Sequence, residues 1–235
     1  MSNNPLIEKL FSVGAHYGYS PSRRHPSVRK YIFGSKGTAE LFDLEQTATC
    51  LTDALSYIAS LAAERKVLLL VSSKAEARES VRKEAEKIGA PYVASRWIGG
   101  TLSNFPEIKK RLNRLAELSD MKEKGELAAR FTKKERVLID REIADLEMMF
   151  GGLRTMQKLP DALFIIDPKQ EQIAVKEAVK MNIPIIALLN NDCDASTITY
   201  PIPANDASLA SLSYIVGEVA KTYATHQGPR PEPQQ

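Results

Sequence analysis

The feature that most constrains the fold is a series of short apolar runs separated by amphipathic segments. The clearest runs are VLLLV at 67–71, ALFII at 162–166 and IPIIALL at 183–189. Runs of strand length without polar alternation are typical of parallel strands that are covered on both faces. The segments around them repeat apolar residues every three or four positions, which predicts helices at 44–63, 75–88, 170–181 and 207–223. Alternating strands and helices predict an α/β fold with a parallel sheet between two helical layers.

Residues 105–150 interrupt this alternation with two long, charged segments of helical periodicity, which are separated near Lys124 and Gly125. We call residues 105–150 the arm. Their apolar residues recur at steps of four and three: Ile108, Leu112, Leu115, then Ile139, Ile143, Leu146 and Phe150. This heptad spacing predicts an antiparallel coiled-coil hairpin that protrudes from the sheet. Thr132 with Glu135 three positions later predicts a capping box at the start of the second helix.

The chain therefore divides into three predicted parts. Residues 1–104 and 151–225 form the sheet domain, with residues 1–40 as its basic N-terminal extension. Residues 105–150 form the hairpin. Residues 226–235, HQGPRPEPQQ, are rich in proline and glutamine and are expected to be disordered.

Positive charge is concentrated near the N-terminus. The segment from Leu10 to Ala39 has no Asp or Glu and holds five cations: Arg23, Arg24, Arg29, Lys30 and Lys36. Because the whole chain carries only +3, its positive excess lies in this segment. Such a segment beside a neutral body is typical of a surface that binds a polyanion, with a merely solvated loop as the alternative. Pro21 and Pro26 predict an extended backbone from which the side chains spread.

The patterns of catalysis are missing from the sequence. The strand at 67–71 runs into Ser72-Ser73-Lys74 without a glycine-rich phosphate loop, so a nucleotide-dependent enzyme is only the second hypothesis. Asp192 and Asp194 are better explained by Asx turns in a strand-end loop than by metal binding. We therefore predict no enzyme activity, no cofactor and no metal.

Localisation is predicted from two further absences. No run approaches the roughly 18 apolar residues of a membrane span, and the first residues show no export signal. We expect a soluble cytoplasmic protein with reduced cysteines.

The stretch RWIGGTLSNF at 96–105 is the most unusual in the chain. Arg96 is placed to contact phosphate, and Trp97 either stacks on a base or, as we favour, packs the hairpin base against the sheet. Ser103 or Asn104 is expected to cap the helix that follows. Further candidate RNA contacts are Lys109, Lys110 and Arg111.

Four long motifs closely resemble the bacterial form of the family of small-subunit ribosomal protein two. They are GAHYGYSPSRRHPSVRKYIFG, RWIGGTLSNF, GGLRTMQKLPDALFIIDPKQEQIAVKEA and IPIIALLNNDCDASTITYPIPANDAS. The resemblance runs in order from about Leu6 to Tyr223. It implies a flavodoxin-like, doubly wound sheet with a coiled-coil arm, contact with small-subunit ribosomal RNA, help in docking ribosomal protein one, and no catalysis. A regulatory RNA-binding protein that acts outside the ribosome is a third hypothesis.

The resemblance also fixes expectations that the structure tests. Five parallel strands are expected near Leu69, Val93, Phe164, Ile186 and Tyr200, in the spatial order 2-1-3-4-5. The sequence departs from the usual family pattern at Tyr19, at Asn190, at Ser35-Lys36-Gly37 and at Ala204-Asn205-Asp206. These departures argue against a tight polar cluster, and against a transition metal held by His16 and the loop at 190–194.

Overall fold

The centre of the molecule is a five-stranded parallel sheet. The computed structural model describes residues 4–228, apart from the side chains at 128 and 129. The strands are β3 (Leu68–Val71), β4 (Tyr92–Val93), β5 (Ala162–Ile166), β6 (Ile185–Leu189) and β7 (Tyr200–Pro203). Their spatial order is β4-β3-β5-β6-β7, and every pair is parallel. This confirms the predicted sheet and its order.

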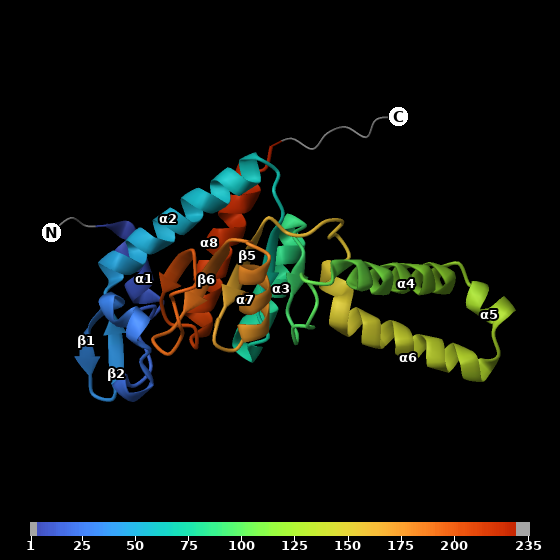
Figure 1. Cartoon of the computed structure of the whole chain (residues 1–235), viewed down its shortest axis with the longest axis horizontal. Coiled ribbons are helices and arrows are strands. Elements are labelled where there is room, and N and C mark those ends of the chain that lie inside the picture. The colour runs from blue at the N-terminus through green and yellow to red at the C-terminus, as the bar shows by residue number, and fades with distance from the viewer. Residues whose placement is uncertain (1–3, 229–235) are drawn as a thin grey trace.

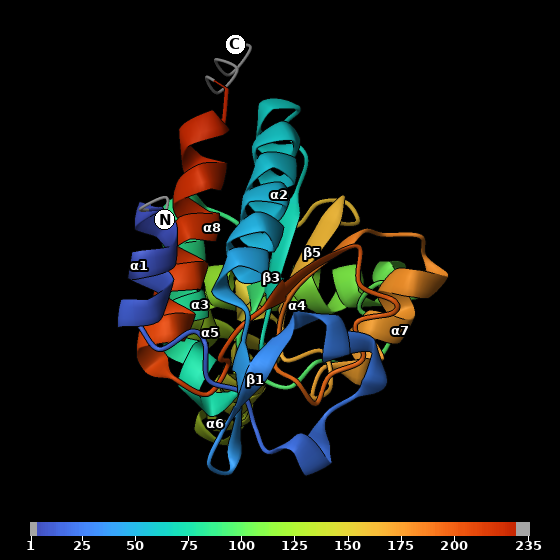
Figure 2. The same cartoon turned by 90° about the vertical axis from the view of Figure 1, so that its left-hand side faces the viewer.

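Helices cover both faces of the sheet (Figures 1 and 2). The helices are α2 (Leu44–Ala63), α3 (Ala75–Ile88), α7 (Gln172–Lys180) and α8 (Leu209–His226). Side chains of β3 and β5 alternate between two apolar clusters: Leu70 and Phe164 join the cluster with α2, α3 and α8, and Leu69 and Ile165 join the one with α7. The strands are thus buried on both faces, as their continuous apolar runs predict. His226 ends α8 rather than starting a tail, and residues 229–235 lie outside the described residues.

The N-terminal part is more structured than the sequence predicts. It contains α1 (Pro5–Ser12), two 3₁₀ helices at Pro21–Arg23 and Pro26–Tyr31, and the antiparallel pair β1 (Ile32–Lys36) and β2 (Ala39–Phe42). The prediction of an extended backbone is wrong because both prolines take the first position of a helical turn, where their missing N–H costs nothing. Leu10, Val28 and Phe42 are buried, so this part contributes to the core.

The segment 105–150 forms α4 (Phe105–Glu123), the short α5 (Glu126–Arg130) and α6 (Lys133–Phe150). Figure 1 shows α4 and α6 side by side, extending to the right of the sheet. Leu112, Leu115, Ile139 and Leu146 are buried in a cluster that continues to the sheet. The capping box of Thr132 and Glu135 is confirmed. Within residues 4–228, no helix is long and apolar enough to cross a membrane.

Candidate nucleic-acid interface

Four of the five N-terminal cations are exposed without a carboxylate partner in the described part of the chain. They are Arg23, Arg29, Lys30 and Lys36. Arg23 lies over the ring of Tyr19 at 5.4 Å, and Lys30 lies 4.8 Å from the centre of the Tyr31 ring. Aromatic rings leave a cation charged and its outer side open to an anion. The 3₁₀ helices and the β1–β2 pair therefore present these cations on one continuous segment, visible at the lower end of Figure 2.

Arg24 differs from the other four cations. Its guanidinium lies 2.7 Å from the carboxylate of Glu40, which is almost fully buried on β2. The expectation that no acid neutralises this segment is wrong at Arg24, because Glu40 follows the acid-free stretch by one residue and the β1–β2 turn folds it back. Arg24 is therefore a structural partner of Glu40, and only part of its charge is left for a polyanion.

A network of buried polar side chains fastens the N-terminal segment to the carboxyl ends of the strands. The Asn191 amide donates to Glu40 at 2.7 Å and to the Tyr19 carbonyl at 2.9 Å. The Asn190 amide donates to Asp206 at 2.7 Å, and the Tyr19 hydroxyl lies 3.5 Å from the same carboxyl. A tight polar cluster thus does join the N-terminal loop to the strand ends, contrary to the sequence-based expectation. The amide of Asn190 donates to a carboxylate, a role that an aspartate lacks when ionised.

Lys74 supplies the positive charge at the centre of this network. Its ammonium lies 2.7 Å from Asp206 and 3.3 Å from Asp167. Burial alone would lower the pKa of Lys74, but the two carboxylates raise it above its ordinary value. Burial raises the pKa of the Asp206 carboxyl, and Lys74 and Asn190 offset part of that effect. Lys74 and Asp206 therefore form a buried ion pair, and removal of either residue would leave the other charge buried without a partner.

The same contacts bear on the hypothesis of a nucleotide-dependent enzyme. A phosphate at the end of β3 would need the N–H of Ser73 and the ammonium of Lys74. The Ser73 N–H already donates to the carboxylate of Glu171 at 2.5 Å, and Lys74 is held by Asp206 and Asp167. A negative side chain thus occupies the position that the nucleotide hypothesis reserves for a phosphate.

The RWIGG stretch is fixed by a residue that sequence reasoning missed. The Glu177 carboxylate of α7 accepts the backbone N–H groups of Gly100, Leu102 and Ser103 at 2.6, 2.9 and 3.1 Å. Burial alone would raise the pKa of Glu177, but these donors hold it below its ordinary value. The expected cap from Ser103 or Asn104 is wrong, since Asn104 takes the cap position without a side-chain bond. One signal for this contact is present in the sequence: the turn that precedes the helix at 105 has backbone N–H groups that need an acceptor from another part of the chain.

Trp97 and Arg96 separate in the structure. Trp97 is 4% exposed and packs with Leu102, Phe150 and Leu153 where the arm meets the sheet. Its ring is thus part of the core at that junction, as we favoured, and is closed to a base. Arg96 beside it is exposed.

The comparisons with known proteins decide the family. The family model described as Ribosomal protein S2 matches residues 10–226. The chain belongs to the ribosomal protein S2 family. Proteins named small ribosomal subunit protein uS2 are among its relatives. That of Chloroflexus aurantiacus is 40% identical over 91% of this chain and 90% of its own length. That of Roseiflexus sp. is 41% identical (91% and 81%), and that of Dictyoglomus thermophilum is 40% identical (92% and 87%).

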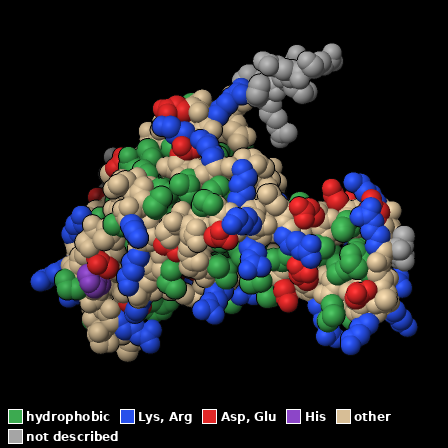
Figure 3. All heavy atoms as spheres, turned by 45° about the vertical axis from the view of Figure 1, so that its right-hand side comes forward, with side chains coloured by type: hydrophobic (Ala, Val, Ile, Leu, Met, Phe, Trp, Pro, Cys, Tyr) green, Lys and Arg blue, Asp and Glu red, His purple; other side chains and the backbone are tan. Residues whose placement is uncertain are grey.

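In this S2-family chain, cations of the arm lie on α4 close to the sheet. Lys109, Lys110 and Arg111 are all exposed. Lys110 is paired with Glu107 at 2.6 Å, three positions earlier on the helix. Figure 3 shows that acidic and basic side chains are interspersed along the arm.

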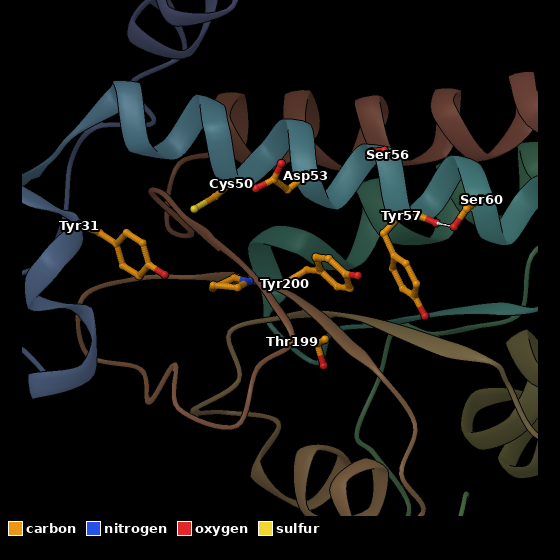
Figure 4. Close-up of a pocket in the computed structure, with 9 residues that line it drawn as sticks. Tyr31, Cys50, Asp53, Ser56, Tyr57, Ser60, Thr199 and Tyr200 are labelled. Atoms are coloured by element: carbon orange, nitrogen blue, oxygen red, sulfur yellow. Dashed lines mark hydrogen bonds between the residues drawn. The ribbon is translucent and has the colours of Figure 1, made fainter.

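A hollow of about 570 Å³ lies between α2 and β7 (Figure 4). The rings of Tyr57 and Tyr200 stack there at 4.4 Å, and Asp53 is the charged residue of the lining. Its lining contains no Lys or Arg. This hollow therefore lacks the charge that phosphate contacts require.

The candidate metal ligands are engaged in other contacts. Asp194 accepts the N–H of Ser196 at 2.9 Å, which is the predicted Asx turn, and Asp192 pairs with Lys169 at 2.8 Å. The His16 ring stacks on Phe11. Over residues 4–228, no three His, Cys, Asp or Glu side chains are grouped as metal ligands. The absence of a bound transition metal stays a prediction.

Proposed function

We propose that this chain is a structural constituent of the small ribosomal subunit and binds small-subunit ribosomal RNA through its N-terminal segment. Membership of the S2 family supports the ribosomal role. The observation that carries the RNA contact is the set of exposed cations without carboxylate partners: Arg23, Arg29, Lys30 and Lys36. Each phosphate that such a cation neutralises releases condensed counterions, which drives binding.

The buried network gives these cations a fixed place. Binding is weakened when side chains and backbone must be ordered at the moment of contact. Asn191, through Tyr19 and Glu40, and Lys74, through the Tyr19 hydroxyl, hold the N-terminal segment on the sheet before RNA arrives. We infer that this reduces the entropic cost of docking and fixes the register of the phosphate contacts.

A second set of RNA contacts is proposed at the base of the arm. Its residues are Arg96, Lys109, Lys110 and Arg111. Arg24 belongs to the N-terminal set and is partly neutralised by Glu40. Lys110 shares its charge with Glu107. We therefore expect a smaller contribution from this set than from the N-terminal cations.

The arm is proposed to be an antiparallel coiled-coil hairpin and a structural unit of its own, residues 105–150. Its apolar side chains follow the heptad spacing, and ion pairs such as Arg114–Glu142 and Lys122–Asp140 link α4 with α6. Residues 1–104 and 151–225 form the proposed sheet domain. Burial of Leu10, Ala15, Val28 and Tyr31 in the core clusters supports this grouping.

We also propose that the chain helps dock ribosomal protein one. A hollow of about 590 Å³ beside α7 is the candidate place, because Val175 and Val179 line it and Lys176 and Lys180 supply charge at it. Val179→Asp is expected to reduce the amount of ribosomal protein one retained on small subunits. Val137→Asp on the arm is the matched control, since both valines are 46% exposed. Equal retention with both variants would exclude this place.

The proposal includes no catalysis and no cofactor, and places the protein on cytoplasmic ribosomes. The engagement of Ser73 and Lys74 by carboxylates supports it over a nucleotide-dependent enzyme. Turnover of a nucleotide by the purified protein would reverse that preference.

Co-sedimentation tests the proposal against a regulatory RNA-binding protein. The chain is added to small subunits that lack their own S2-family protein and pelleted at low and at high salt. A resident protein is expected to saturate near one copy per subunit and to stay through a high-salt wash. Failure to pellet at low salt overturns the proposal, and loss of most of the protein in the wash favours the regulatory role.

A further inference from the structure

Three aromatic rings lie against one another at the surface of the N-terminal segment: those of Phe11 and His16 are stacked, and that of Tyr17 is tilted by 38° against His16. Phe11 lies in the last turn of α1, and its ring lies 4.7 Å from that of His16 at an angle of 9°. The Tyr17 ring follows at 4.1 Å from His16. Phe11 is 63% and Tyr17 45% exposed, although aromatic rings normally gain stability by burial. Leu10 already anchors α1 in the core, so the packing of α1 does not require Phe11.

The backbone under this stack is held in place. Gly14 turns the chain at φ +70°, and its carbonyl accepts the Asn205 amide at 3.1 Å. The Ala15 carbonyl accepts the Asn205 N–H at 2.8 Å, and the His16 carbonyl accepts the Phe42 N–H at 2.8 Å. The rings are thus mounted on a turn that is bonded to two other parts of the fold, and are not on a free end.

A cation lies near the rings. Phe11, His16 and Tyr17 belong to the acid-free stretch from Leu10 to Ala39. Burial and then the nearby Lys36 lower the pKa of His16, so the imidazole is neutral at pH 7. Its buried Nδ1 has no hydrogen-bond partner among the residues that the structure describes. A neutral stack of rings beside a cation matches a nucleobase with its phosphate, because every base has a π-face and every nucleotide a negative charge.

We propose that Phe11, His16 and Tyr17 form a stacking platform for an unpaired base of small-subunit ribosomal RNA, with Lys36 beside it for the phosphate. This inference rests on the proposed RNA-binding function and adds a contact that is independent of salt. A protein partner is the alternative occupant of exposed rings. The nearby Lys36 favours RNA, because it can pair with the phosphate of the nucleotide whose base stacks on the rings.

The test measures binding of the full chain to small-subunit ribosomal RNA over a series of salt concentrations. Phe11→Leu keeps an apolar side chain but removes the π-face, and is expected to weaken binding roughly ten-fold with an unchanged salt slope. Phe11→Trp is expected to bind as well as the original chain or better. Leu209→Ala is the matched control, because Leu209 is also 63% exposed but lies on α8. Urea unfolding of each variant verifies that the fold is kept.

The outcomes separate the platform from the broader function. If the unmodified chain does not bind this RNA, the proposed function fails. If it binds and Phe11→Leu binds equally well, the platform alone is overturned. If Phe11→Leu binds RNA normally but weakens assembly with ribosomal proteins, the rings face a protein instead.

Discussion

The N-terminal segment, residues 10–42, and the arm, residues 105–150, are both rich in cations but neutralise them differently. In the arm, eleven Lys and Arg stand among ten Asp and Glu, and carboxylates pair with Lys110, Arg114, Lys122, Lys124 and Arg130. In the N-terminal segment only Arg24 has such a partner. Exposed ion pairs add little stability. A cation that is paired with a carboxylate is, however, less available to bind phosphate. The comparison teaches that the local excess of cations over acids, large in the N-terminal segment and close to zero in the arm, marks the surface for a polyanion.

The two regions are also held by different forces. The arm has its own apolar seam, with Leu115 and Leu118 almost fully buried. The N-terminal segment buries Leu10, Val28 and Phe42 in the core of the sheet domain. It also depends on long-range polar contacts from Tyr19 to Lys74, Asn191 and Asp206. A substitution in the network should therefore loosen the N-terminal segment, whereas a substitution in the apolar seam should loosen the arm alone.

The largest effect is expected for Lys74→Met. It leaves Asp206 buried without its cation, which costs about 3–5 kcal/mol of the free energy of unfolding. Urea unfolding measures this, and amide exchange should locate the loosened region at residues 14–42. Lys87→Met removes an exposed ammonium paired with Glu84 and should change stability by less than about 0.5 kcal/mol. Similar losses in the two variants would contradict the role given to the network.

The next largest loss of stability is expected for Leu115→Ala. Leu115 is fully buried in the arm, and such truncations cost about 2–5 kcal/mol. Faster amide exchange is expected in α4 and α6, with exchange at residues 14–42 unchanged. If the N-terminal segment loosens as well, the two regions are not independent.

A smaller, pH-dependent effect is expected at Glu177. Its pKa is lowered in the folded protein, so its carboxylate stabilises the fold at pH values above the ordinary 4.5. That contribution is lost as the pH falls through the folded pKa, where protonated Glu177 resembles glutamine. Urea midpoints of the original chain and Glu177→Gln should differ at pH 7 and converge once the pH has fallen below the folded pKa of Glu177. A constant difference would show that the charge of Glu177 does not hold the arm junction.

The smallest effect is expected for Lys122→Ala. Its ion pair with Asp140 links α4 to α6, but both side chains are about half exposed. Exposed pairs contribute about 0–1 kcal/mol. A loss above about 2 kcal/mol in urea unfolding would mean that charges, rather than the apolar seam, hold the arm together.

Sequence reasoning succeeded where the signals are local. The bounds of α2 and α3 were predicted to the residue, since each has a periodic apolar face and α3 ends at Gly89 in the left-handed conformation. The network was missed because its partners, such as Tyr19 and Asn191, lie 172 residues apart. The β1–β2 pair was missed because its short strands show no clear alternation. The basic segment itself was visible, but the loss of Arg24 to Glu40 required the fold.

The salt dependence of RNA binding tests the central claim most directly. Two variants each remove four cations, and both are measured against small-subunit ribosomal RNA. One replaces the unpaired residues Arg23, Arg29, Lys30 and Lys36 by Ala; the other replaces the paired arm residues Arg114, Lys122, Lys124 and Arg130. At about 0.7–0.9 per phosphate contact, the first should flatten the plot of log affinity against log salt by about 3, and the second by less than about 1. An unchanged slope in the first variant, or equal flattening in both, would contradict the account.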